Sequence, residues 1–216
     1  MTAGVIFDVD GVLLDSMPVW NQAGELYLQS LGIKAEPDLG KILFPMSMQA
    51  GASYLLQHYP LTGLTKKEVM TGINKTIQDF YFYKAPLKAG VKHFLSMLHK
   101  KGIPITIATS SDRILIEAAL KRTDIFGYFS KIFTCSELGT GKEHPDIYLE
   151  AAKWMQSFPE DTWVFEDAPH ALATAKKAGF KCAGVYDGTI KELQSDVMQL
   201  SDIYIKQFTE LTDIIL

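Results

Sequence analysis

Short runs of almost continuously apolar residues constrain the fold of this chain more than any other feature. The first run, residues 4–7, is followed at once by two aspartates, and the next run does not begin until Ile103. Runs that are apolar on both faces are typical of strands buried in a parallel sheet. We therefore predict strands over residues 4–7, 103–108, 131–134, 162–165, 181–185 and 202–205.

Amphipathic helical patterns separate the later strands. They cover residues 90–101, 112–121, 145–155 and 168–178. Gly179 directly follows the last pattern, at a position where a glycine commonly ends a helix. The alternation of strand and helix predicts an α/β fold, a Rossmann-like parallel sheet covered by helices on both faces.

The segment between residues 16 and 85 differs because helical patterns dominate it and no convincing strand appears. The predicted helices are residues 18–31, 48–58 and 65–84. Thr65 and Glu68 have the spacing of a capping box, which marks a helix start. The sequence therefore predicts a discontinuous α/β core, residues 1–15 and 86–216, with an inserted α-helical cap domain at residues 16–85.

Composition excludes several classes of protein. The 216 residues are 47% hydrophobic, and the net charge of −4 comes with no Lys/Arg cluster larger than a pair, which argues against nucleic acid. The two cysteines have no CxxC spacing, so neither a disulfide scaffold nor a zinc site is expected. No apolar run reaches transmembrane length, and no signal peptide precedes the first strand, so we expect no membrane partner and a cytoplasmic location. We expect a monomer or weak dimer.

Two acidic pairs follow predicted strands. Asp8 and Asp10 come after the first strand, and Glu166 and Asp167 come after the strand at residues 162–165. The carboxyl ends of parallel strands meet at one edge of a sheet, where ligands bind. Four carboxylates there repel one another, and Mg²⁺, which prefers oxygen ligands, relieves that repulsion. The simpler alternatives are a solvated turn after the first strand and an Asp167 that only caps a helix.

Hydroxyl groups and one lysine complete this set. Thr109, Ser110 and Ser111 close the strand that begins at Ile103, and hydroxyls at a helix start suit a phosphoryl oxygen. We expect Ser111 to cap the following helix, which leaves Thr109 at the strand end. Lys142 precedes another predicted helix and would offset the charge of a phosphoryl group.

The order Asp-x-Asp, Thr, Lys, Glu-Asp resembles the haloacid dehalogenase superfamily, and within it the β-phosphoglucomutase-like branch with a small helical cap. Residues 8–16 are similar to the opening motif of that family, DxDGx followed by two apolar residues and DS. Thr109, Lys142 and the pair Glu166-Asp167 match its second, third and fourth motifs. The resemblance covers essentially the whole chain.

The resemblance implies an Mg²⁺-dependent phosphatase that hydrolyses a small phosphate monoester, such as a sugar phosphate, through an aspartyl-phosphate. Asp8 would be the nucleophile, and Asp10 would protonate the leaving alkoxide and then activate water. The implied substrate-binding residues are Gly11, Thr109, Ser110 and Lys142. The implied metal ligands are Asp8, Asp10 through its backbone carbonyl, Asp167 and Glu166.

The main alternative is a sugar phosphomutase, which must bind a second phosphate with cationic side chains of the cap. The segment from Leu39 to Gln49 contains no arginine, and the first arginine of the chain is Arg113. This favours hydrolysis, because lysine lacks the bidentate fork of arginine. A phosphoryl-receiver domain and a non-catalytic binding protein fit the pattern less well. We expect the aromatic run at residues 80–83 to serve in packing, and for Trp20 we favour packing over a place in the substrate pocket.

Overall fold

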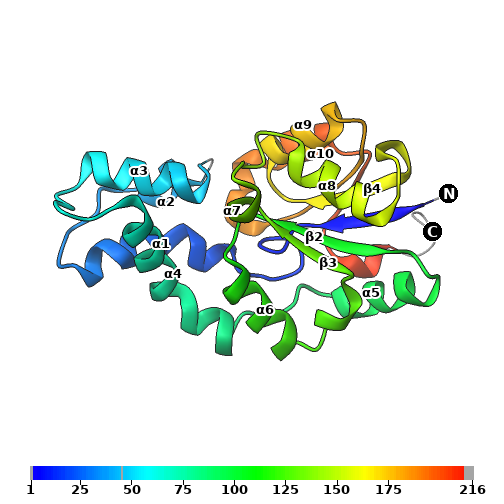
Figure 1. Cartoon of the computed structure of the whole chain (residues 1–216), viewed down its shortest axis with the longest axis horizontal. Helices are drawn as coiled ribbons and strands as arrows, with labels where there is room; N and C mark the ends of the chain where they lie inside the picture. The colour runs from blue at the N-terminus through cyan, green and yellow to red at the C-terminus, as the bar shows by residue number, and fades with distance from the viewer. Residues whose placement is uncertain (1, 45, 212–216) are drawn as a thin grey trace.

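The computed structural model describes residues 2–44 and 46–211, and its centre is one parallel sheet (Figure 1). The strand order is β3-β2-β1-β4-β5-β6, and every neighbouring pair is parallel. The strands are β1 (Gly4–Phe7), β2 (Ile105–Thr109), β3 (Lys131–Thr134), β4 (Thr162–Glu166), β5 (Lys181–Val185) and β6 (Ile203–Ile205). The predicted α/β fold with a parallel sheet is confirmed.

Strand β1 lies in the middle of the sheet because its side chains are apolar on both faces. Val5 and Phe7 belong to one apolar cluster, and Ile6 belongs to the cluster on the opposite face. This alternation is the period-2 pattern of a strand. Phe7 pairs in register with Ile107 of β2 and Phe165 of β4. The residues that follow these three therefore emerge at the same edge of the sheet.

Helices cover both faces of the sheet (Figure 1). Side chains of α5 and α6 pack with Val5 and Phe7, whereas those of α8, α9 and α10 pack with Ile6. The helices of this part are α5 (Val91–Lys100), α6 (Arg113–Arg122), α7 (Cys135–Leu138), α8 (Asp146–Met155), α9 (Pro169–Lys177) and α10 (Gln194–Leu200). Short 3₁₀ segments lie at Phe126–Tyr128, Pro159–Asp161, Gly188–Leu193 and Phe208–Glu210.

Four further helices lie to one side of the sheet, at the left of Figure 1, and we call them the cap helices. They are α1 (Met17–Ser30), α2 (Leu39–Leu43), α3 (Met48–His58) and α4 (Lys66–Tyr83). The capping box predicted at Thr65 and Glu68 is present at the start of α4. Gly40 of α2 faces the backbone carbonyl of Asn21 so closely that a Cβ atom would clash with it. Glycine at this position therefore lets α2 lie directly against α1.

The two chain segments that lead into and out of the cap helices lie side by side. Asp15 N–H donates to Pro86 O at 3.0 Å, and Lys88 N–H donates to Leu13 O at 2.9 Å. These contacts place the two connections next to each other, close to the predicted limits of residues 16 and 85. The division into core and cap at these positions stays a prediction.

Three helices were not predicted from the sequence. Helices α2 and α7 have five and four residues, too few to show a helical period, and α10 follows an irregular 3₁₀ segment. In the residues that the structure describes, no helix has both the length and the apolar character needed to cross a membrane.

Candidate active site

A cavity of about 190 Å³ lies between the cap helices and the carboxyl ends of β1, β2 and β4. The core side of this cavity, which we call the core wall, carries the predicted chemical residues. They are Asp8, Asp10, Thr109, Ser110, Lys142, Glu166 and Asp167. The structure thus brings together, at one sheet edge, side chains that are separated by up to 159 positions in the sequence.

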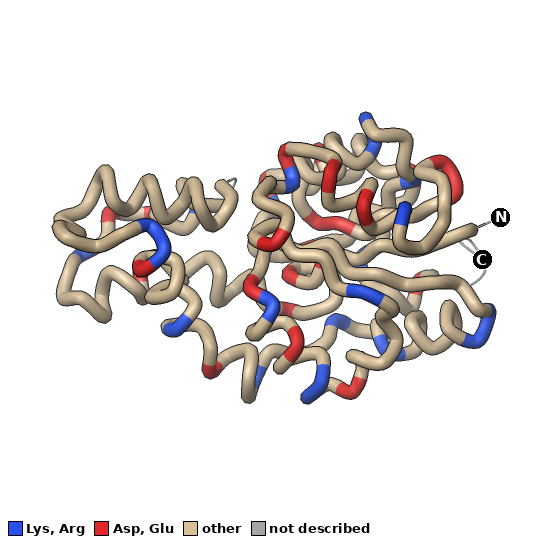
Figure 2. The backbone as a smooth tube through the Cα atoms, viewed as in Figure 1, with Lys and Arg blue, Asp and Glu red and all other residues tan. Residues whose placement is uncertain are grey.

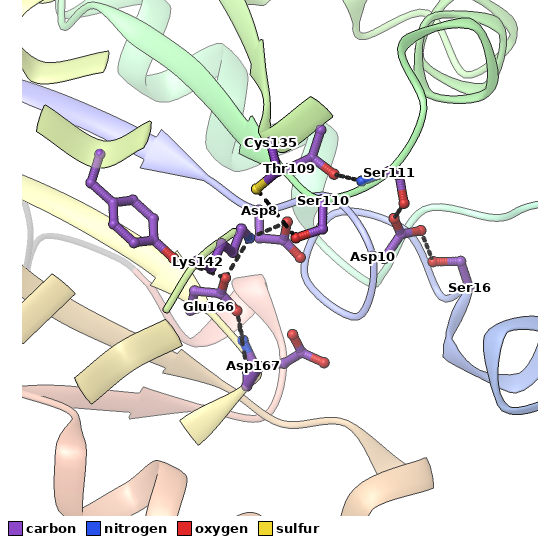
Figure 3. Close-up of polar contacts among 12 residues, drawn as sticks. Asp8, Asp10, Ser16, Thr109, Ser110, Ser111, Cys135, Lys142, Glu166 and Asp167 are labelled. Carbon is purple, nitrogen blue, oxygen red and sulfur yellow. Dashed lines mark hydrogen bonds and ion pairs between the residues drawn. The ribbon is translucent and has the colours of Figure 1, made fainter. Parts of the chain in front are cut away.

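Lys142 is the centre of the charged part of the core wall (Figure 3). Its Nζ atom lies 2.6 Å from Asp8 Oδ1 and 2.5 Å from Glu166 Oε1, and all three side chains are buried. The hydroxyl of Tyr148 donates to the same Glu166 oxygen at 3.3 Å. One cation therefore holds two carboxylates that come from two different strand ends.

The third carboxylate, Asp167, has a different environment. Its Oδ2 atom is buried and has no hydrogen-bond partner in the described part of the chain. Gly11, at φ 78°, lies so close to it that a Cβ atom would collide with this oxygen. Ligand atoms of Asp8, Glu166 and Asp167 all lie within 4.8 Å of one another. A partnerless buried oxygen in such a cluster fits a hard cation such as Mg²⁺.

Asp167 does not cap the helix that follows it, which excludes the simpler alternative that capping is its only role. Ala168 occupies the N-cap position of α9 and provides no side-chain cap. Instead, Glu166 Oε2 accepts the Asp167 N–H at 2.9 Å and the Ala168 N–H at 3.2 Å. Glu166 therefore supplies the hydrogen bonds at the start of α9, and the Asp167 side chain is left for the cavity.

Burial sets the protonation of these acids. It raises the pKa of Asp8 to about 7, although Lys142 acts in the opposite direction. Burial, and then the charges of Glu166 and Asp8, raise the pKa of Asp167 well above its ordinary value. Burial also opposes the ionisation of Glu166, but Lys142 outweighs it and keeps that pKa low. In the absence of a further cation, the site therefore favours the ionised form of Glu166, whereas it opposes the ionisation of Asp8 and Asp167.

Asp10 lies apart from these three carboxylates, in a shell of hydroxyl groups (Figure 3). Ser16 Oγ donates to its Oδ1 at 2.5 Å, Ser111 Oγ donates to its Oδ2 at 2.5 Å, and the Tyr81 hydroxyl donates to Oδ1. Trp20 Nε1 in turn donates to the Tyr81 hydroxyl at 2.5 Å. The expected cluster of four carboxylates therefore contains three of them, and the fourth is held separately.

This arrangement corrects two expectations about single residues. Ser111 does not cap α6, because Asp112 is the N-cap and its side chain accepts the Ile114 N–H at 2.9 Å. Trp20 is not only a packing residue, since it lines the cavity and contacts Tyr81.

Thr109 and Ser110 lie at the end of β2, on the same wall. Thr109 is buried, and its Oγ1 atom accepts the Ser111 N–H at 3.1 Å. The Ser110 hydroxyl lies 3.5 Å from Cys135 Sγ. Both residues line the cavity beside Asp8, so the structure places them where the sequence predicted. Their assignment to substrate binding stays a prediction.

Sequence reasoning gave Ser16, Tyr81 and Tyr148 no role in this site and gave Ser111 only a capping role. Ser16 carried a usable signal, because it belongs to the opening motif quoted above. Tyr81 had no such signal, since three other aromatic residues surround it in the sequence and only the fold selects the one that meets Asp10.

A family model described as haloacid dehalogenase-like hydrolase matches residues 2–179. The chain therefore belongs to the haloacid dehalogenase-like hydrolase family, which confirms the resemblance and the prediction of an enzyme of the phosphatase class.

Relatives of the chain include both phosphatases and a mutase. It is 27% identical to hexitol phosphatase B of Escherichia coli, over 96% of this chain and 93% of that protein. It is 28% identical to β-phosphoglucomutase of Bacillus subtilis, over 96% of this chain and 91% of that protein. The structure of CbbY from Rhodobacter sphaeroides in complex with xylulose-(1,5)bisphosphate superimposes with a TM-score of 0.86 at 20% identity, covering 98% and 96% of the two chains. At 20% identity, the similarity to the CbbY structure shows a shared fold and nothing about activity.

Proposed function

We propose that this protein hydrolyses a small phosphate monoester, a sugar phosphate or similar metabolite, with Mg²⁺ and through an aspartyl-phosphate on Asp8. The observation that carries the proposal is the core wall itself. Asp8 lies in a three-carboxylate cluster with one partnerless oxygen, while Asp10, two residues along the chain, is held by hydroxyls outside that cluster. Phosphatases named among the relatives support the same reaction.

The separation of the two aspartates suits a division of labour. A nucleophile must be charged and fixed, and Asp8 is fixed by Lys142. A general acid and base must exchange protons, and Asp10 is surrounded by groups that carry exchangeable protons. In the proposed reaction, an Asp8 oxygen attacks phosphorus while Asp10 protonates the departing alkoxide. Asp10 then takes a proton from the water that hydrolyses the aspartyl-phosphate.

Lys142 and Thr109 would hold the phosphoryl oxygens during both steps, together with Ser110 and backbone groups near Gly11. Both Lys142 and Thr109 line the cavity next to Asp8. Charged and hydrogen-bonding donors fixed around a phosphoryl group stabilise the charge that develops on it.

The residues that would hold Mg²⁺ are Asp8, Asp167 and the backbone carbonyl of Asp10, with Glu166 beside them. When bound, the ion would screen the carboxylates from the phosphate dianion and polarise a phosphoryl oxygen. The raised pKa values of Asp8 and Asp167 support this assignment, because both acids need a further positive charge to ionise together at neutral pH.

The test is hydrolysis of p-nitrophenyl phosphate with and without Mg²⁺. We expect activity with Mg²⁺, none with EDTA, and none from Asp8→Asn, because a neutral amide does not attack phosphorus. Asp79→Asn, the same change at an exposed position of α4, should keep full activity. Near wild-type turnover by Asp8→Asn would overturn the aspartyl-phosphate mechanism.

A sugar phosphomutase is the second possibility, and the β-phosphoglucomutase among the relatives favours it. Against it, all six lysines of the cap segment, Lys34, Lys41, Lys66, Lys67, Lys75 and Lys84, are exposed, and none lines the cavity. The two reactions are separated with β-glucose 1-phosphate, Mg²⁺ and a trace of the 1,6-bisphosphate. Faster formation of glucose 6-phosphate than of inorganic phosphate would establish the mutase.

A further inference from the structure

The cap side of the cavity, which we call the cap wall, differs in kind from the core wall. Its lining comes from α1 to α4 and the loops between them, and it contains no charged residue in the described part of the chain. The large side chains of the cap wall are Met17, Trp20, Leu43, Phe44, Met46, Met48 and Ile73. Figure 2 shows the same contrast, since α3 contains no Lys, Arg, Asp or Glu along its whole length.

Among the described residues of the cap wall, two polar side chains besides the Trp20 indole face the cavity. Ser47 already accepts the Ala50 N–H at 3.3 Å as the N-cap of α3. Asn21 makes no side-chain hydrogen bond to any residue that the structure describes. The Trp20 N–H is used by the Tyr81 hydroxyl. The cap wall therefore offers one uncommitted amide and one partly used hydroxyl to a bound molecule.

A phosphate monoester in this cavity has a fixed orientation. Its phosphoryl group belongs at Asp8 and Lys142, so the alcohol part of the ester must extend toward the cap wall. A hydroxyl that loses water there without gaining a partner lowers affinity by about tenfold. A second phosphate would lose its hydrating water against apolar side chains and would find no cation to pair with. This loss would lower the affinity even more than an unpaired hydroxyl does.

We propose that the leaving group is a largely apolar body, aromatic or branched aliphatic, with at most one or two hydrogen-bonding groups. This inference rests on the proposed phosphatase function. Among the small phosphate monoesters proposed there, it favours esters of apolar alcohols over the sugar phosphates given as the example, and it also disfavours bisphosphates. The methionines suit such a ligand because their flexible thioether side chains adapt to irregular apolar surfaces.

Two esters of matched shape test the inference. Cyclohexylmethyl phosphate and glucose 6-phosphate both carry a phosphorylated primary carbon on a six-membered ring, and they differ mainly in their hydroxyl groups. We expect kcat/KM to be at least about tenfold higher for the cyclohexylmethyl ester. An equal or higher value for glucose 6-phosphate would overturn the inference while leaving phosphatase activity intact. Failure to hydrolyse p-nitrophenyl phosphate as well would instead overturn the proposed function, and the inference with it.

Met48→Gln tests the cap wall directly, because it keeps the length of the side chain and makes its end polar. We expect the preference for the cyclohexylmethyl ester to fall by about tenfold, with the inhibition constant of inorganic phosphate unchanged. Met70→Gln is the matched control, since Met70 of α4 packs on the core and does not line the cavity. A similar loss of preference in both variants would contradict the assignment.

Gly51→Ala gives a second test that does not depend on polarity. A Cβ atom at Gly51 would meet only Leu43, at 3.7 Å, so the methyl group enters the cavity without a clash. Alanine also favours a helix over glycine, so α3 should remain folded. We expect kcat/KM to fall severalfold for the cyclohexylmethyl ester and to stay within about twofold for ethyl phosphate, in line with the effect of one methylene in an apolar pocket. Equal losses for both esters would show that the leaving group does not lie on the cap wall.

Discussion

The two walls of the cavity differ in charge: the core wall is rich in charged side chains, and the cap wall is mainly apolar. The core wall concentrates charge: Asp8, Glu166 and Asp167 lie within 4.8 Å of one another, and Lys142 bridges two of them. The cap wall avoids charge and places apolar side chains and glycines around the same space. This difference indicates that the core wall performs a fixed reaction on a phosphoryl group, while the cap wall selects the remainder of the molecule. Changes to the core wall should therefore affect every substrate, and changes to the cap wall only some.

The largest expected effect comes from Lys142→Met. The change leaves Asp8 and Glu166 buried without their cation, and Met has nearly the same length. We expect kcat to fall by about 10²–10³ for all esters. We also expect the metal-free protein to lose about 3–5 kcal/mol of unfolding free energy, because a broken buried ion pair leaves unpaired charge. Enzyme assays and urea denaturation measure the two effects.

Lys92→Met is the control for this variant, since the Lys92–Asp124 pair at 2.8 Å is exposed to solvent. It should change neither rate nor stability measurably. If Lys142→Met lost activity toward one ester but kept it toward another, the division between the two walls would be wrong.

Tyr81→Phe tests a hydrogen bond that crosses from a cap helix to the core wall, from the Tyr81 hydroxyl to Asp10. It removes the hydroxyl that donates to Asp10 and leaves the buried ring in place. We expect kcat to fall by about tenfold to a hundredfold with little change in KM, because a general acid that is slightly misplaced transfers protons poorly. Tyr83→Phe, at a position that is 71% exposed, should have no effect.

A change in KM alone for Tyr81→Phe would mean that Tyr81 contacts the leaving group and not Asp10. Steady-state kinetics with p-nitrophenyl phosphate and with an alkyl phosphate separates these outcomes. We expect kcat to fall more for the alkyl ester, since its alcohol is the poorer leaving group and depends more on protonation.

The stability of the metal-free protein should depend on pH in a direction set by the core wall. The pKa of Asp8 rises from 3.8 to about 7 on folding, so between these values the folded protein keeps a proton that the unfolded chain releases. Stability therefore falls as pH rises through this window, and Asp167 acts in the same direction. We expect a lower Tm at pH 7 than at pH 5 in EDTA, and a larger gain from Mg²⁺ at pH 7.

Thermal melting of Asp167→Asn provides the comparison for this prediction. Its Tm in EDTA should depend less on pH than that of the wild type, and Mg²⁺ should raise it less. An EDTA-treated wild type that becomes more stable from pH 5 to pH 7 would contradict the charge balance described for the core wall.

The smallest effect is expected from the lysines of the cap segment. Lys41→Gln and Lys75→Gln remove exposed cations that do not line the cavity. We expect kcat/KM for a monophosphate to stay within about twofold of the wild type, since exposed charges act weakly at a distance through water and salt. A large loss with a bisphosphate substrate would show that the cap grips a second phosphate, and would favour the mutase.

Much of the core could be predicted because its signals are local. Each strand is a short apolar run, and β1, β3, β4 and β5 were placed to within one residue of their observed bounds. The acidic pairs and Thr109 lie at strand ends, and Lys142 lies in the loop before α8. Parallel strands bring their carboxyl ends to one edge whatever the details of the packing. The short helices α2 and α7 escaped prediction because one turn of helix leaves no periodic pattern.

The sequence by itself thus determined the strand ends, the order of the reactive residues and the lack of cap arginines. Only the tertiary structure decided which partner each acid meets: Lys142 for Asp8 and Glu166, hydroxyls from three separate segments for Asp10, and no partner for Asp167. It also decided which apolar residues of the cap line the cavity and which fill the core. The physical reason is that strand and helix patterns depend on neighbours along the chain, whereas hydrogen bonds, burial and pKa values depend on neighbours in space.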